Sequence, residues 1–174
     1  MSFEIKNRVA ESSLITIDFD EFINQKKIIV FDLKMWLKDE LILIEKDFRN
    51  NVNNYNWKDY NEHLVLIQCS NNAIIPHWAY LLISSKLKAN GIKNFIGSEE
   101  DYNNYSIINS IHNIDLNEFK EKSVIVKGCS KYANKNYYYS LIIDKIQNEV
   151  KSLMFGEACS SVPIFKRKKY CYNL

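Results

Sequence analysis

Short apolar runs alternate with amphipathic stretches along most of the chain from residue 63 onward. Runs rich in Val, Ile and Leu predict strands over residues 63–69, 93–96, 124–127 and 152–155. Apolar spacing and end signals predict helices over residues 76–89, 98–111 and 136–150. Alternating strands and helices are typical of βαβ units in a mainly parallel sheet. We therefore expect an α/β fold, a three-layer sandwich around a doubly wound sheet.

The section before this core has a less regular pattern. Residues 14–19 alternate as a strand does, and residues 27–33 (KIIVFDL) predict a second strand. Residues 41–44 are expected to pair with this second strand as a β-hairpin, and residues 45–53 to form a helix.

We interpret the whole chain, residues 1–174, as one domain. Residues 1–60 form its N-terminal β/α extension, residues 63–156 its βαβ core, and residues 166–174 a tail. The segment before this tail (PIFK) is expected to add a last strand.

Three of the four cysteines lie just past an apolar run, and a serine follows each of them. The pairs are Cys69–Ser70, Cys129–Ser130 and Cys159–Ser160. Calling the four core strands one to four, a sheet order of 2-1-3-4 makes strands one, three and four neighbours. Neighbouring strands lie ~4.8 Å apart. This order therefore predicts three thiols at one edge of one sheet.

Three converging thiols favour a soft metal, and we expect zinc or an iron–sulfur cluster at Cys69, Cys129 and Cys159. The competing interpretation is three small buried residues at strand ends. The serines Ser70, Ser130 and Ser160 could donate hydrogen bonds to the ligands or cap turns.

Two further residues near the cysteines have alternative interpretations. Glu157 could act as a general base or hydrogen-bond acceptor, or could be a solvated turn carboxylate. Cys69 precedes a helix that starts at Pro76, and His77 could supply a fourth ligand or be a partly exposed surface residue.

Two other function classes remain open. One is a cysteine-dependent enzyme with Cys69 as nucleophile and His77 or Glu157 as base. The other is a scaffold protein whose cysteines only fill space. Cys171, in the tail, is interpreted as incidental.

Composition limits the partners and the compartment. The formal net charge of +2 gives no electrostatic reason to expect nucleic acid or an anionic membrane as partner. No apolar run is long enough to span a membrane, and the N-terminal segment has no apolar signal core. We therefore expect a cytoplasmic protein whose thiols stay reduced. Glycine-rich phosphate-binding motifs do not occur.

Several long segments together resemble an uncharacterised bacterial family, the domain of unknown function 2480 family. The segments are NRVAESSLITIDFDEF, FDLKMWL, LILIEKDFR, CSNNAIIPHWAY, VKGCSK and KSLMFGEACSSVPIFKRK. The family has no established activity, so the resemblance supplies no catalytic residues. It implies a place near iron–sulfur assembly genes, and hence iron–sulfur assembly proteins as partners. A homodimer is expected if two chains share one cluster.

Overall fold

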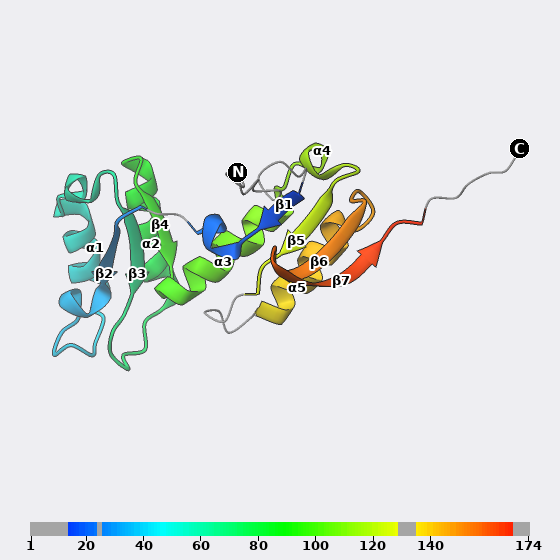
Figure 1. The fold of residues 1–174 in the computed structure, drawn as a ribbon. Helices are drawn as coiled ribbons and strands as arrows, with labels where there is room; N and C mark the ends of the chain where they lie inside the picture. The colour runs from blue at the N-terminus through cyan, green and yellow to red at the C-terminus, as the bar shows by residue number, and fades with distance from the viewer. Residues whose placement is uncertain (1–13, 24–25, 129–134, 169–174) are drawn as a thin grey trace, which may run out of the picture. The chain divides into compact units, whose positions relative to one another are not determined.

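The computed structural model describes residues 14–23, 26–128 and 135–168. These residues divide into two compact units, drawn in Figure 1. Unit 1 contains the described residues up to Ile23 and from Asn104 onward, and unit 2 contains those between them. Both units combine helices with mostly parallel strands, so the predicted α/β class is confirmed. The interpretation of the chain as one domain stays a prediction.

Unit 2 contains a parallel sheet of three strands. Its order is β2 (Ile28–Asp32), β3 (Leu64–Gln68) and β4 (Lys93–Ile96). The helices and short 3-10 helices of this unit are η2 (Leu33–Trp36), α1 (Glu45–Asn54), η3 (Trp57–Tyr60) and α2 (His77–Ala89).

The central strand β3 is apolar along most of its length because both faces of the sheet are covered there. On one face, Val65 and Ile67 pack with buried side chains of α1 and α2. On the other face, Leu64 and Leu66 pack with Tyr102, which belongs to α3 (Glu99–His112).

Unit 1 contains a four-stranded sheet. Its order is β1 (Leu14–Ile17), β5 (Ser123–Val126), β6 (Ser152–Glu157) and β7 (Ser160–Lys166). The first three strands are parallel, and β7 returns antiparallel to β6. The remaining elements are η1 (Phe19–Phe22), α4 (Leu116–Phe119) and α5 (Lys135–Ile146). The boundary between the units falls within α3.

The predicted sheet order 2-1-3-4 is wrong. The first two core strands, β3 and β4, belong to the sheet of unit 2, whereas β5 and β6 belong to the sheet of unit 1. The reason lies in the N-terminal section, whose strands complete the two sheets. Strand β1 pairs with β5, and strand β2 pairs with β3. Both N-terminal strands are therefore edge strands beside a central strand.

The predicted hairpin between residues 27–33 and 41–44 is also wrong. Strand β2 pairs in parallel with β3 along its whole length, and Ile42 instead forms an isolated antiparallel bridge with Lys38. An apolar run shows that a strand is favoured there but does not identify its partner. The last strand expected before the tail is present as β7.

Candidate functional site at the carboxyl edge of unit 2

Strands β2 and β3 end at the same edge of the sheet of unit 2. Asp32, the last residue of β2, is in register with Gln68, the last residue of β3. Cys69 follows directly. In open α/β sheets, ligands bind beyond the carboxyl ends of the strands. This edge is therefore the first place to look for a functional site in unit 2.

The Asp32 carboxylate connects the ends of the two strands. Its Oδ1 accepts hydrogen bonds from the backbone N–H of Lys34, at 3.0 Å, and from that of Ser70, at 3.1 Å. The first bond caps the 3-10 helix η2. Burial tends to raise the pKa of Asp32, but the hydrogen bonds from Ser70 and Lys34 outweigh it and hold this pKa below its ordinary value. Asp32 is therefore ionised at neutral pH.

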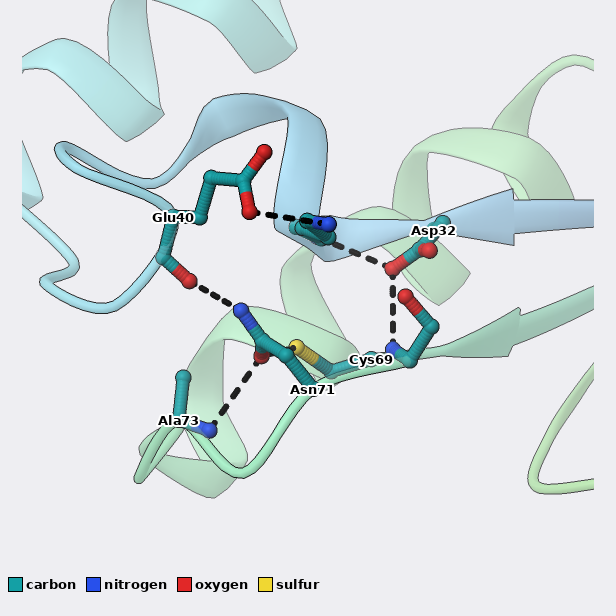
Figure 2. A network of polar contacts seen from close by, with 7 residues as sticks. Asp32, Glu40, Cys69, Asn71 and Ala73 are labelled. Carbon is teal, nitrogen blue, oxygen red and sulfur yellow. Dashed lines mark hydrogen bonds and ion pairs between the residues drawn. The ribbon is translucent and has the colours of Figure 1, made fainter.

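Cys69 is a free, half-buried thiol that packs against the apolar cluster beneath α1 and α2. Its Sγ donates a hydrogen bond to Oδ1 of Asn71 at 2.9 Å. The same oxygen accepts the backbone N–H of Ala73 at 3.2 Å. Figure 2 shows Cys69 and Asn71 side by side in this network. The thiol thus has a fixed position at the edge.

Asn71 also connects this loop to a second one. Its Nδ2 donates to the backbone carbonyl of Glu40, as Figure 2 shows. Asp39 and Glu40 both have left-handed backbones, with φ of 50° and 60°, in the tight turn closed by the bridge between Lys38 and Ile42. Non-glycine residues adopt this conformation at a cost. The contacts of Glu40 help to hold the turn beside the thiol.

Two further side chains place polar groups within electrostatic range of the thiol. Lys34 forms an ion pair with Glu40, with Nζ and Oε2 2.8 Å apart. This pairing raises the pKa of Lys34, with smaller contributions from Asp32 and Cys69. Burial raises the pKa of Tyr80, again with smaller contributions from Cys69 and Asp32. At neutral pH the sulfur therefore has an ammonium and a neutral phenol in its surroundings.

The surface beside this network is hollowed and apolar. A cavity of about 410 Å³ opens there, lined by Leu41, Ile42, Leu43, Asn72, Ala73, Ile74 and Pro76. Ile74 is 94% exposed, and Leu41 and Ile42 are each 57% exposed. The turn at Glu40 and the loop at Asn71 border both the hollow and the thiol network.

A family model matches residues 3–167 of the 174 residues. The chain belongs to the family described as "Protein of unknown function (DUF2480)". The resemblance seen in the sequence is thereby confirmed. The family's description gives no activity, so the DUF2480 match assigns neither a reaction nor a site residue. No curated protein and no solved structure matches the chain.

Two of the predicted metal ligands of this DUF2480 protein follow strands of different sheets, so the expectation of three thiols at one edge of one sheet is wrong. Cys69 lies at the edge of unit 2, whereas Cys159 is an exposed free thiol between β6 and β7 of unit 1. Cys129 and Ser130 lie outside the described residues. Within the described ranges, no three His, Cys, Asp or Glu side chains are grouped so that they could hold a metal ion. The three-thiol centre stays a prediction.

The other predicted site residues also divide between the units. Ser70 belongs to the network around Asp32, through its backbone N–H. Glu157 and Ser160 are paired across the start of the β6–β7 hairpin in unit 1. His77 is exposed at the first position of α2, and among the described hydrogen bonds none involves its side chain.

Sequence reasoning missed most of the groups around the thiol: Asp32, Lys34, Glu40, Asn71 as an acceptor, and Tyr80. A usable signal was present for Asp32, which follows the apolar run KIIVF as Cys69 follows HLVLIQ. Asp32 therefore occupies the same kind of strand-end position as the cysteine. Within the described residues, no helix is both long and apolar enough to cross a membrane.

Proposed function

We propose that this DUF2480 protein binds zinc or an iron–sulfur cluster through thiolate ligands, with Cys69 as the ligand that unit 2 supplies. Cys129 and Cys159 are the other proposed ligands. The serine after each cysteine (Ser70, Ser130 and Ser160) and Glu157 would form hydrogen bonds with the ligands and tune their donor strength. A role accessory to cluster assembly or transfer in the cytoplasm fits a thiolate site, because thiols stay reduced there.

The observation that carries the proposal is the position of the Cys69 thiol. It is free, half-buried and held at the carboxyl end of a central strand by Asn71. A thiol must lose its proton to bind a metal, and the resulting negative charge must be offset. The Lys34 ammonium lies within electrostatic range to do so.

Elemental analysis of the protein purified without oxygen tests this proposal. We expect iron or zinc in stoichiometric amount, together with acid-labile sulfide and visible absorption if the group is a cluster. Cys69→Ser, Cys129→Ser and Cys159→Ser should each lower the metal content, whereas Cys171→Ser, the matched control, should not. A wild-type chain without metal above background, or an unchanged content in Cys69→Ser, would contradict the proposal.

A second candidate function is chemistry with Cys69 as nucleophile. The polar surroundings of the thiol favour it, because Lys34 and Tyr80 could stabilise charge that develops at the sulfur or on a substrate. Alkylation by limiting iodoacetamide separates an activated thiol from an ordinary one. If Cys69 is activated, it is labelled faster than Cys159, although Cys159 is the more exposed thiol. Labelling that follows exposure, with Cys159 first, would rule this candidate out.

A further inference from the structure

In the sheets of the two units, the central strand and the next strand are separated by the same number of residues along the chain. In unit 2, Leu64 of the central strand is in register with Lys93 of the next strand. In unit 1, Ser123 of the central strand is in register with Ser152. The two differences in residue number are equal, because 93 − 64 and 152 − 123 give the same value. We call the difference between the two central strands, 123 − 64 = 59 in residue number, the repeat offset.

The repeat offset also relates the buried positions of the helices. In unit 2 these positions lie on α1 and α2, and adding the repeat offset to each gives a buried position of unit 1. The pairs are Phe48 and Ile107, Val52 and Ile111, Ala79 and Tyr138, Ile83 and Ile142, and Leu87 and Ile146. Each set packs with its own central strand. The two cores are therefore built on one pattern.

Backbone details recur at the repeat offset as well. The short helix Trp57–Tyr60 corresponds to Leu116–Phe119. Glu62 and Glu121 have φ of 67° and 57°, and Gly97 and Gly156 have φ of 140° and 119°. Such conformations are rare, so their recurrence at one offset without gaps is not explained by a shared fold class alone.

The first strands of the two sheets also correspond, through their partners on the central strands. Phe31 of β2 pairs with Ile67, and Ile17 of β1 pairs with Val126, the counterpart of Ile67 at the repeat offset. The residues that follow, Asp32 and Asp18, are therefore equivalent. Both carboxylates cap the following 3-10 helix by accepting a backbone N–H two positions later, at 3.0 Å in each case.

Each of the two aspartates has a second partner among the described residues. Asp18 forms an ion pair with Lys127, with Oδ2 and Nζ 3.0 Å apart. The counterpart of Lys127 in unit 2 is Gln68, since 127 − 59 = 68. Asp32 accepts the N–H of Ser70, the residue that follows Cys69. The counterpart of Ser70 at the repeat offset, Cys129, lies outside the described residues. Among the described contacts, the equivalent carboxylates thus hold a lysine side chain in unit 1 and the backbone beside the Cys69 thiol in unit 2.

We infer that the chain is an internal duplication, in which residues 45–97 and 104–156 are two copies of one unit, and that Asp32 is the positioning residue for Cys69. Asp32 holds the Cys69–Ser70 peptide through the Ser70 N–H. Asp18 is the equivalent residue on the strand that pairs with the other copy, and it forms an ion pair with Lys127. The positioning role rests on the proposed function, since it assigns the thiol of unit 2 as the functional group.

Paired substitutions in the two copies test this inference. In a chain whose other cysteines are replaced by serine, Cys69 is the only thiol, and Asp32→Ala, Asp32→Asn and Asp18→Ala are made in that background. Asp32→Ala should speed hydrogen exchange of the Ser70 amide roughly tenfold, because one hydrogen bond is lost. It should also change the alkylation rate of Cys69. Asp32→Asn retains an acceptor oxygen and should restore most of both properties, and Asp18→Ala should change neither.

Equal effects of Asp18→Ala and Asp32→Ala, or no effect of Asp32→Ala, would overturn the positioning role. If Asp32→Ala does not fold, the wild-type chain supplies the measurement. The chemical shift of the Ser70 amide proton should titrate at a pH below the ordinary carboxyl pKa, following Asp32. A Ser70 amide that does not titrate in acid would exclude the contact. None of these readouts needs a bound metal, so the two failures are distinguishable: a protein without metal would defeat the proposed function, and an Asp32→Ala variant without effect would defeat the contact between Asp32 and the Cys69–Ser70 peptide.

Discussion

The carboxyl edges of the sheets in units 1 and 2 each carry an equivalent aspartate, Asp18 and Asp32, whose described contacts differ. In unit 1, Asp18 and Lys127 neutralise each other. In unit 2, Asp32 accepts hydrogen bonds from two backbone N–H groups, and the polar groups around it lie close to the Cys69 thiol. Within the described residues, the two copies thus keep the same core pattern and the same capping carboxylate, while the second described partner of that carboxylate is a lysine side chain in unit 1 and a backbone N–H beside a thiol in unit 2.

The equivalent core positions Ile83 and Ile142 should give the largest effects. Both side chains are at most 1% exposed, so replacing either with alanine should lower the free energy of unfolding by about 2–5 kcal/mol. All three tryptophans, Trp36, Trp57 and Trp78, belong to unit 2. In denaturant titrations, Ile83→Ala should therefore shift the fluorescence transition more than Ile142→Ala, while circular dichroism should register both. Equal shifts in fluorescence would show that each core does not stabilise its own unit.

The paired glycines should give smaller and unequal effects. Gly97→Ala and Gly156→Ala each put a side chain on a left-handed backbone, at a cost of about 1–3 kcal/mol. A Cβ at position 156 would lie 2.6 Å from the backbone oxygen of Ser160, whereas at position 97 the nearest atom is 3.0 Å away, on the Phe95 ring. A ring can move more easily than a backbone. In thermal unfolding, the Tm of Gly156→Ala should be lower than the Tm of Gly97→Ala, and the reverse order would contradict the geometry.

Lys127→Gln should give the smallest effect. It places in unit 1 the residue found at the equivalent position of unit 2, and it removes a partly exposed ion pair. Pairing with Asp18 raises the pKa of Lys127, so its stabilising contribution is present below the ordinary lysine pKa of 10.5 and is lost as pH rises through the raised value. The difference in Tm between wild type and variant should disappear in strong alkali. A difference that persists there would mean that packing, not charge, is involved.

The sequence was sufficient to predict most strands and helices but not which strands pair with one another. The runs around Leu64–Gln68 and Ser123–Val126 were identified as strands because buried strands are almost continuously apolar. Nothing in such a run identifies the strand it pairs with, so the pairing of β1 with β5 and of β2 with β3 does not follow from the sequence pattern. The duplication was hidden because Ala79 and Tyr138, or Cys69 and Gly128, occupy equivalent positions with little chemical likeness.

The candidate site was predicted only in part for the same reason. Cys69 was found because a cysteine at a strand end is conspicuous. Asp32, Lys34 and Tyr80 lie at the same edge only because β2 pairs with β3 and α2 packs on that sheet. Contacts between residues so far apart in the chain depend on topology, which local patterns do not specify.

X-ray absorption spectroscopy of the metal that copurifies with the protein tests thiolate ligation most directly. Thiolate ligation predicts sulfur neighbours at ~2.3 Å from the metal, with fewer sulfur neighbours in Cys69→Ser and an unchanged shell in Cys171→Ser. A metal surrounded only by oxygen and nitrogen, or a sulfur shell unaffected by Cys69→Ser, would contradict it.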